Sequence, residues 1–317
     1  MSKKMVFFLF KLVFGFGLLL YLVLYIARPQ EIFTAIRDVF WPLAALAFGL
    51  HIFGFLFSAR RWKLILDEYG ADFSIPQLTR SLLVGTFFNL FLPTRFGGDV
   101  MRVSDTRHIE QGMTASLAVI VYERMSGIVA LLVFALCASL LKIRFITEMP
   151  FLYVSLLVSL LGIVLLVLAW KKVPRGFLVG LNCRRPWGRR ILDQLDRFHA
   201  IILDFVNHRA LSRKVFFWAL LLQFNVVIHY YLIGQALRLG RIPLLDYFFS
   251  IPIMLFVLSF PVSINGIGVR DLFLIQLFTF YGYPASVAIA FSLLDLAFNL
   301  LLGIIGGLIY IFRKNEK

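Results

Sequence analysis

Long runs of apolar residues constrain this chain more than any other feature of its sequence. An α-helix needs roughly 20 consecutive apolar residues to span a bilayer core of about 30 Å. Several runs approach or exceed this length, and 61% of the 317 residues are hydrophobic. The sequence therefore predicts an all-α polytopic membrane protein with about six full transmembrane helices. The predicted spans are 5–27, 41–59, 113–141, 150–170, 215–237 and 284–312.

Two shorter apolar runs, 81–92 and 247–260, each end at a proline that is followed by glycines. Runs of about 12–14 residues are too short to cross a bilayer. Irregular backbone at membrane depth is tolerated where it faces protein or a water-filled cavity instead of lipid. We therefore expect two re-entrant broken helices, over 81–102 and 247–270.

The two breaks share the spacing of their key residues. "PTRFGGDVMR", which begins at Pro93, and "PVSINGIGVR", which begins at Pro261, both have glycine five positions after the proline and arginine nine positions after it. The flanking spans also correspond, so we expect two membrane halves, 1–145 and 146–317. Three full crossings per half is an odd number, so the second half enters the membrane with the opposite orientation. Such an inverted repeat with broken helices recurs in transporters.

The charge distribution predicts the orientation. Lys and Arg total 32 against 17 Asp and Glu, and basic loops stay on the cytoplasmic side of a membrane. With the basic loop 171–214 on the cytoplasmic side, both termini are also cytoplasmic, and we expect a multi-pass protein of the cytoplasmic (inner) membrane. The basic excess then reflects orientation and contact with anionic lipid, so we expect no nucleic-acid partner. The loop segment "GRRILDQLDRFHAIILDFVNH" has apolar residues at helical spacing, which predicts an amphipathic helix on anionic inner-leaflet lipids. The alternative is a solvated connector with some helix.

The residues around each break predict a site for an anionic group. Glycine permits a tight turn, and a helix that starts after the turn presents unpaired N–H groups and a positive dipole end. An arginine fork matches a phosphate. Asn89 and Asn265 flank the breaks and are candidates to satisfy the backbone groups that the breaks free. We expect a site for the phosphate-bearing headgroup of a membrane lipid, built from Arg95, Gly97, Gly98, Asp99 and Arg102 at the first break and Asn265, Gly266, Gly268, Arg270 and Asp271 at the second.

Glu123, Arg124 and Asp295 are charged residues that lie inside predicted spans. Intramembrane charges are costly and usually functional, so we include all three in the predicted binding site. Glu123 and Arg124 are adjacent in the helix and point in different directions, so they need separate partners. We expect Arg95 or Arg102 to pair with Glu123, and an acid or a lipid phosphate to pair with Arg124. The alternative is a structural ion pair that holds helices together.

No enzyme signature accompanies these residues. The sequence contains no His-Glu-x-x-His, no Asp-x-Asp, no Walker loop and no Cys or His cluster at metal-ligand spacing. We therefore expect no catalytic residue, no metal and no cofactor. Asn225 and His229 share one face of span 215–237, where we favour a hydrogen-bonded structural role for the histidine over proton transfer.

With these residues in view, the chain resembles the membrane half of the lysylphosphatidylglycerol synthase family, which is the flippase part of multiple peptide resistance factors. The family implies a helical flippase-like fold that moves lipids between leaflets, and its fused members carry a soluble synthase domain that charges phosphatidylglycerol with lysine. This chain ends just after its last span, so we expect a free-standing member that does not make the aminoacylated lipid. Asp271 stands where many relatives have glutamate. The resemblance extends over nearly the whole chain and rests on "RRWKLIL" (Arg61, Trp62), "FFNLFLPTRFGGDVMR", "VIVYERMSG" (Glu123, Arg124, Gly127) and "FPVSINGIGVRD".

Three functions remain open at this point. The first is a lipid flippase whose cargo is aminoacylated lipid, another phospholipid, or a polyprenyl-phosphate or glycolipid carrier. The second is a membrane-embedded lipid transferase with Glu123 as base. The third is a non-transporting protein that presents lipid to a glycosyltransferase or synthase. A lipid-modifying enzyme and a second copy of the chain are candidate partners.

Overall fold

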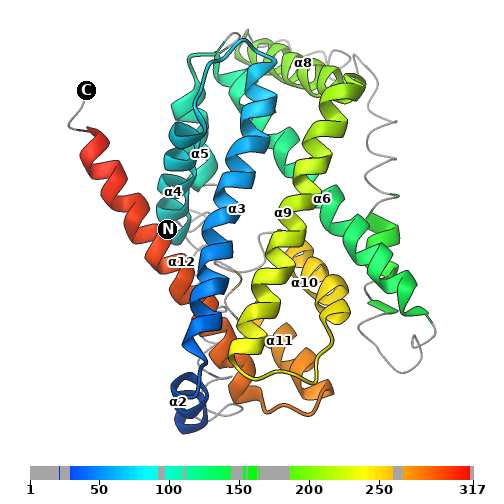
Figure 1. The fold of residues 1–317 in the computed structure, drawn as a ribbon. Helices are drawn as coiled ribbons and strands as arrows, with labels where there is room; N and C mark the ends of the chain where they lie inside the picture. Colours follow the sequence, from blue (N-terminus) through cyan, green and yellow to red (C-terminus); the bar gives the residue numbers. More distant parts are fainter. Residues whose placement is uncertain are drawn as a thin grey trace.

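The computed structural model shows a bundle of α-helices (Figure 1). It describes residues 21, 29–91, 97–109, 112–143, 153–154, 156–162, 164, 186–259, 266 and 268–314. Every regular element within these ranges is helical, so the predicted all-α class is confirmed. The helices are α2 (Pro29–Arg37), α3 (Trp41–Asp67), α4 (Ile75–Phe91), α5 (Gly97–Thr106), α6 (Gly112–Leu141), α8 (Pro186–Asn207), α9 (Arg209–Ala236), α10 (Leu244–Ser259), α11 (Val269–Phe280) and α12 (Ala285–Lys314).

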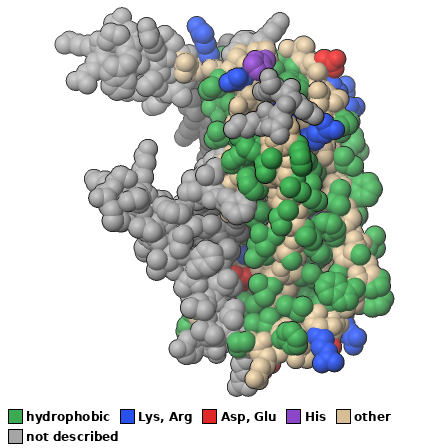
Figure 2. Space-filling model, turned by 90° about the vertical axis from the view of Figure 1, so that its left-hand side faces the viewer, with side chains coloured by type: hydrophobic (Ala, Val, Ile, Leu, Met, Phe, Trp, Pro, Cys, Tyr) green, Lys and Arg blue, Asp and Glu red, His purple; other side chains and the backbone are tan. Residues whose placement is uncertain are grey.

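Four of these helices, α3, α6, α9 and α12, are long and apolar enough to cross a membrane. They coincide with the predicted spans 41–59, 113–141, 215–237 and 284–312. Large apolar side chains are exposed along them, and Figure 2 shows such side chains between charged groups at the two ends of the bundle. The chain is therefore a multi-pass membrane protein. The predicted spans 5–27 and 150–170 lie largely outside the described residues.

The helices α2 and α3 show differences from the prediction. The first of the four spans was expected to end at residue 59, before a pair of arginines, but α3 continues to Asp67. Arg61 and Trp62 are buried there, because Arg61 has an ionic partner within the bundle. The short helix α2 was not predicted. It begins at Pro29, as suits a residue without an N–H donor, and buries Ile32.

Each broken segment consists of two helices, α4 with α5 and α10 with α11. The helices α5 and α11 continue past the predicted ends at 102 and 270. The helix α4 starts before the apolar run does, because Ser74 and Gln77 cap it. The Ser74 N–H donates to Gln77 Oε1 at 2.9 Å, and the Gln77 N–H donates to Ser74 Oγ at 3.4 Å.

Helices of the two predicted halves interlock. The helix α3 packs beside α9, α4 packs against α12, and α10 packs against α6 (Figure 1). Small residues permit the close approach of α4 and α12: a Cβ atom on Gly306 would lie only 2.0 Å from the Leu83 carbonyl oxygen. Membrane helices commonly use such glycines, since packing and not hydrophobicity drives their association.

Ion pairs hold the ends of these interlocked helices. Arg313, in the last turn of α12, donates to Asp105 of α5 at 2.9 Å, and Ser81 of α4 donates to the same carboxylate at 2.6 Å. At the opposite end, Lys142 follows α6 and pairs with Asp246 of α10. The C-terminal end of α12 is thus joined to α5, and the C-terminal end of α6 is joined to α10.

The predicted amphipathic helix is present as α8, which lies across one end of the bundle (Figure 1). Its Phe205 is buried and contacts Tyr69 and Tyr122, with ring centroids 5.5 Å and 5.0 Å away. Burial and the neighbouring carboxylates of Asp204 and Glu68 raise the pKa of Tyr69 to about 12. The phenol therefore stays neutral and packs in the interface between α3 and α8.

Candidate functional site

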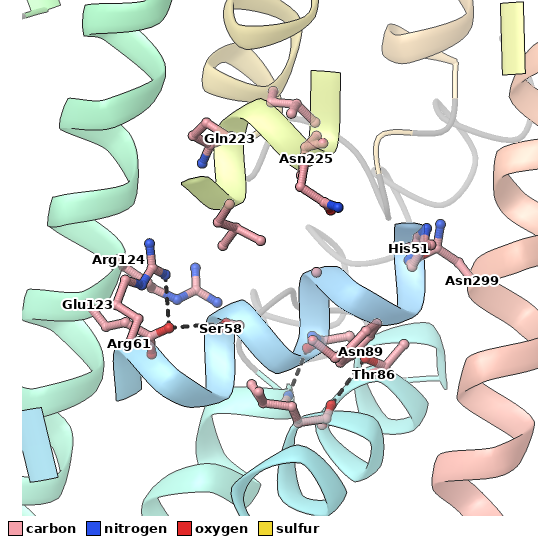
Figure 3. A pocket seen from close by; sticks show the side chains of 18 of the residues that line it. His51, Ser58, Arg61, Thr86, Asn89, Glu123, Arg124, Gln223, Asn225 and Asn299 are labelled. Atoms are coloured by element: carbon pink, nitrogen blue, oxygen red, sulfur yellow. Dashed lines mark hydrogen bonds and ion pairs between the residues drawn. The ribbon is translucent and has the colours of Figure 1, made fainter. Parts of the chain in front are cut away.

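A cavity of about 520 Å³ lies among α3, α4, α5, α6, α9, α10 and α12 (Figure 3). A second cavity of about 350 Å³ adjoins it and shares Thr86, Asn89, Arg124, Asp295 and Asn299 with it. The wall of the first cavity contains many polar and charged side chains. Its polar and charged residues include His51, Ser58, Arg61, Thr86, Asn89, Asp99, Arg102, Glu123, Arg124, Gln223, Asn225, His229, Asp295 and Asn299.

Glu123 of α6 lies between two arginines. Arg61 of α3 donates from Nη2 to Glu123 Oε1 at 2.8 Å, and Ser58 donates to the same oxygen at 3.3 Å. Arg102 of α5 donates to the other carboxylate oxygen. The Arg102 guanidinium also lies 4.1 Å from the centre of the Trp62 ring, in a cation–π contact. One carboxylate therefore joins three helices, and Arg102 is one of the two partners that the sequence predicted for it.

Arg124 turns away from its neighbour and pairs with Asp99 of α5, at 2.6 Å. An acidic partner was one of the two that the sequence predicted. The Arg124 side chain is 38% exposed, whereas the side chains of Arg61 and Arg102 are 7% and 9% exposed. Among these three arginines, Arg124 is therefore the one that a ligand entering the cavity can reach most directly.

A second arginine is paired with an acid of α12. Arg270 of α11 donates from Nη1 to Asp295 Oδ2 of α12 at 2.6 Å, and from Nη2 to the Ser292 carbonyl oxygen at 3.1 Å. Arg102 of α5 and Arg270 of α11 are thus each paired with an acid inside the next long helix. Unlike Arg102, Arg270 faces the second, adjoining cavity.

The residues at the breaks correct one expectation. The Gly98 N–H donates to Asn89 Oδ1 at 2.7 Å, and the Gly268 N–H donates to Asp271 Oδ2 at 2.7 Å. These two N–H groups, which we expected to face an anion, are thus engaged by side chains of the protein. Glycine is nevertheless required at Gly266 and Gly268, whose φ angles of 77° and 82° fall in the left-handed region.

The predicted site residues divide into three groups. Gly98, Asp99, Arg102, Glu123, Arg124 and Asp295 line the first cavity, and Arg270 lines the second. Gly97, Gly266, Gly268 and Asp271 are buried at or just before the starts of α5 and α11. Arg95 and Asn265 lie outside the described residues.

Sequence reasoning missed several residues of the cavity wall, among them His51, Ser58 and Arg61 of α3. Arg61 falls beyond the predicted end of span 41–59, because an arginine usually ends an apolar span. The only signal was its place in "RRWKLIL", one of the stretches that carries the family resemblance. The other two come from α3, where they interrupt an apolar pattern with no recognisable motif.

The fold and the cavity define a helical, multi-pass membrane protein with charged groups gathered in its interior. The chain belongs to the family described as lysylphosphatidylglycerol synthase TM region, whose family model matches residues 8–307. Neither a curated protein nor a solved structure matches the chain.

Proposed function

We propose that this protein is a flippase-type transporter that moves a lipid with a phosphate-bearing headgroup between membrane leaflets. The observation that carries the proposal is the cavity of about 520 Å³ with Arg61, Arg102 and Arg124 in its wall. Ligand pockets typically have about 300–1,000 Å³, which is enough for a headgroup. Charges at membrane depth are costly and are retained chiefly for function. The headgroup would occupy the cavity while the acyl chains stay in the bilayer.

The first contact of the phosphate would be Arg124. Its guanidinium is the most exposed of the three, and a guanidinium fork can donate two hydrogen bonds to one phosphate. The phosphate would replace the Asp99 carboxylate as its partner. An ion pair that is partly exposed costs less to open than a fully buried one, so Arg124 can change partners.

Glu123 supplies a second group that can change partners. It is shared by Arg61 and Arg102, and a shift toward either arginine would free the other. Arg61 Nε, Arg61 Nη1 and Arg102 Nε have no hydrogen-bond partner among the described residues. These donors could serve a phosphate oxygen as the cavity changes its access from one leaflet to the other. Arg270 and Asp295 would play the same part in the second half.

The helix packing supports two inverted halves, 1–145 and 146–317. The helix α4 of the first half packs on α12 of the second, and α10 of the second half packs on α6 of the first. A two-fold repeat produces such reciprocal packing. We place the α8 end of the bundle, with both chain termini, on the cytoplasmic side of the cytoplasmic membrane, next to anionic lipid. A lipid-modifying enzyme would supply or consume the transported lipid.

The proposal is tested with purified protein in liposomes that contain NBD-labelled phosphatidylglycerol or NBD-labelled phosphatidylcholine. Dithionite destroys only the fluorophores in the outer leaflet, so translocation appears as loss of the protected fraction. We expect faster loss with protein than without it, and a slower rate with Arg124→Gln. Arg209→Gln is the matched control, because Arg209 is an exposed arginine at the start of α9, away from the cavity.

Mass spectrometry of lipid that copurifies with the protein completes the test. A retained phospholipid that changes leaflet supports the flippase. A chemically altered lipid would instead indicate a transferase. A lipid that is retained but never changes leaflet would indicate a protein that presents lipid to a partner enzyme.

A further inference from the structure

Three potential metal ligands from three different helices meet on the wall of the first cavity. They are His51 of α3, His229 of α9 and Asp295 of α12, and their ligand atoms all lie within 4.8 Å of one another. His229 and Asp295 are buried, with 3% exposure each, and His51 is partly buried. All three side chains line the cavity. Of these three residues, only Asp295 has a part in the proposed transport.

The hydrogen bonds of His229 determine which of its nitrogens carries a proton. Its Nδ1 lies 2.8 Å from the Ala47 carbonyl oxygen, which can only accept, so Nδ1 is the donor. A neutral His229 therefore turns the lone pair of Nε2 toward His51 Nδ1, at 3.3 Å, and Asp295 Oδ1, at 3.5 Å. A histidine that binds a metal commonly donates its other N–H to a backbone carbonyl in this way.

Asp295 divides its two oxygens between different partners. Oδ2 accepts from Arg270 at 2.6 Å and from Tyr230 at 3.4 Å. Among the described residues, the contact found for Oδ1 is the His229 nitrogen, which has no proton to give when the ring is neutral. A buried carboxylate oxygen that faces imidazole lone pairs is stabilised by a cation between them.

Two of the three separations between ligand atoms agree with a tetrahedral metal centre. Zinc binds histidine nitrogen at about 2.0–2.1 Å, which places neighbouring tetrahedral ligand atoms about 3.3–3.4 Å apart. The separations are 3.3 Å for the two histidines and 3.5 Å for His229 and Asp295, and the His51 and Asp295 atoms lie within 4.8 Å. Two imidazoles with one carboxylate form a ligand set that suits zinc and related transition metals.

We propose that His51 Nδ1, His229 Nε2 and Asp295 Oδ1 bind one divalent transition-metal ion of the zinc class, with its fourth position open to the cavity. Three protein ligands leave one position for water or for an oxygen of a bound anion. Because Arg270 already balances the charge of Asp295, the metal would add positive charge to the cavity. That charge favours a phosphate oxygen as the fourth ligand.

The sequence alone does not reveal such a site. Metal motifs are recognised when their ligands lie a few residues apart, whereas these ligands come from α3, α9 and α12. The packing of α3 beside α9 brings the two histidines together, with ring centroids 4.8 Å apart. The expectation of no metal was based on the absence of a local motif.

The test measures metal binding directly and does not depend on transport. Protein without a polyhistidine tag is stripped with a chelator and titrated with Co²⁺, whose absorption in the visible range reports tetrahedral coordination. Bound Co²⁺ and Zn²⁺ are then counted by elemental mass spectrometry. We expect one ion per chain, with displacement of Co²⁺ by Zn²⁺.

Variants identify the ligands. His51→Ala and His229→Ala should weaken Co²⁺ binding by more than about 10-fold, since losing even a residue that only orients a ligand costs about 10–100-fold. His51→Gln is a second variant in case His51→Ala does not fold, because glutamine keeps a polar side chain of similar length at this partly buried position. His108→Ala is the matched control, because His108 is exposed outside the cavity and the variant has the same number of histidines as His51→Ala.

Two results would overturn the proposal. One is stripped wild-type protein that remains folded but takes up neither ion at micromolar concentration, as a neutral, hydrogen-bonded histidine pair would behave. The other is uptake by folded His51→Ala or His51→Gln protein that equals uptake by His108→Ala. Transport without bound metal would contradict neither the flippase proposal nor a metal site that these measurements establish.

Discussion

Arg102 and Glu123 form a buried ion pair that connects the short helix after the first break to the long helix that follows it. Arg270 and Asp295 connect α11 to α12 in the same way, at 2.6 Å. In each case the acid lies inside a helix long enough to cross the membrane. The buried charge of each acid is thus matched by an arginine from the short helix that precedes it.

Glu123→Gln should destabilise the protein more than Arg102→Met does. Removing the carboxylate leaves the buried guanidinium of Arg61 without a counter-charge and leaves Arg102 only its longer ion pair with Asp99, at 3.7 Å. Stranding a buried charge costs about 3–5 kcal/mol. Removing Arg102 leaves Glu123 still paired with Arg61. Thermal unfolding in detergent, with the exposed Glu31→Gln as control, would give this order. The reverse order would show that Arg61 does not compensate for Arg102.

Arg102→Met and Arg270→Met should each slow lipid translocation by roughly 10–100-fold. This is the effect of losing a charged hydrogen bond worth about 1.5–3 kcal/mol, if both arginines serve the headgroup as it passes. Initial rates in the liposome assay measure it, with gel filtration to show that each variant is folded. A loss confined to one variant would contradict a binding site built from both halves.

The sequence was sufficient for the elements whose signal is local. Apolar runs predicted α3, α6, α9 and α12, and the repeated proline, glycine and arginine spacing predicted the two broken segments. It also named Arg102, with Arg95 as the alternative, as the partner of Glu123, because a charge inside an apolar run needs a partner.

Contacts between distant segments could not be predicted in this way. Hydropathy placed Arg61 outside the membrane, since only Glu123 of another helix makes its burial tolerable. His51 has no distinguishing neighbours in sequence, and its relation to His229 arises only when α3 packs beside α9. Asn89 accepts from the Gly98 N–H, as its place beside the first break suggested. The Gly268 N–H is engaged by Asp271, which the pattern had placed at the anion site instead.

Gly98→Ala should destabilise the protein by about 1–3 kcal/mol, the usual cost of forcing an extra carbon into a packed interior. Its Cβ atom would lie 2.6 Å from the Gly85 carbonyl oxygen, so α4 and α5 would have to move apart. Gly49→Ala in α3 is the matched control, because its Cβ atom would meet nothing within 4 Å. Thermal unfolding of the two variants would show the difference, and equal stability would contradict the close crossing of α4 and α5.

Labelling from the two sides of the membrane should distinguish the two ends of the bundle. Thr34 is exposed on α2, and Arg209 is exposed where α9 starts, at the end covered by α8 (Figure 1). After Cys137 and Cys183 are replaced by serine, an impermeant thiol reagent should label Thr34→Cys in intact cells and Arg209→Cys only in permeabilised cells. This follows from the positive-inside rule, because α8 is part of the basic segment 171–214.

Labelling of both cysteines from outside would contradict the placement of these residues at opposite ends. Labelling of Arg209→Cys in intact cells and of Thr34→Cys only in permeabilised cells would be consistent with the fold but would place the basic segment outside. The electrostatic argument for anionic lipid next to α8 would then fail.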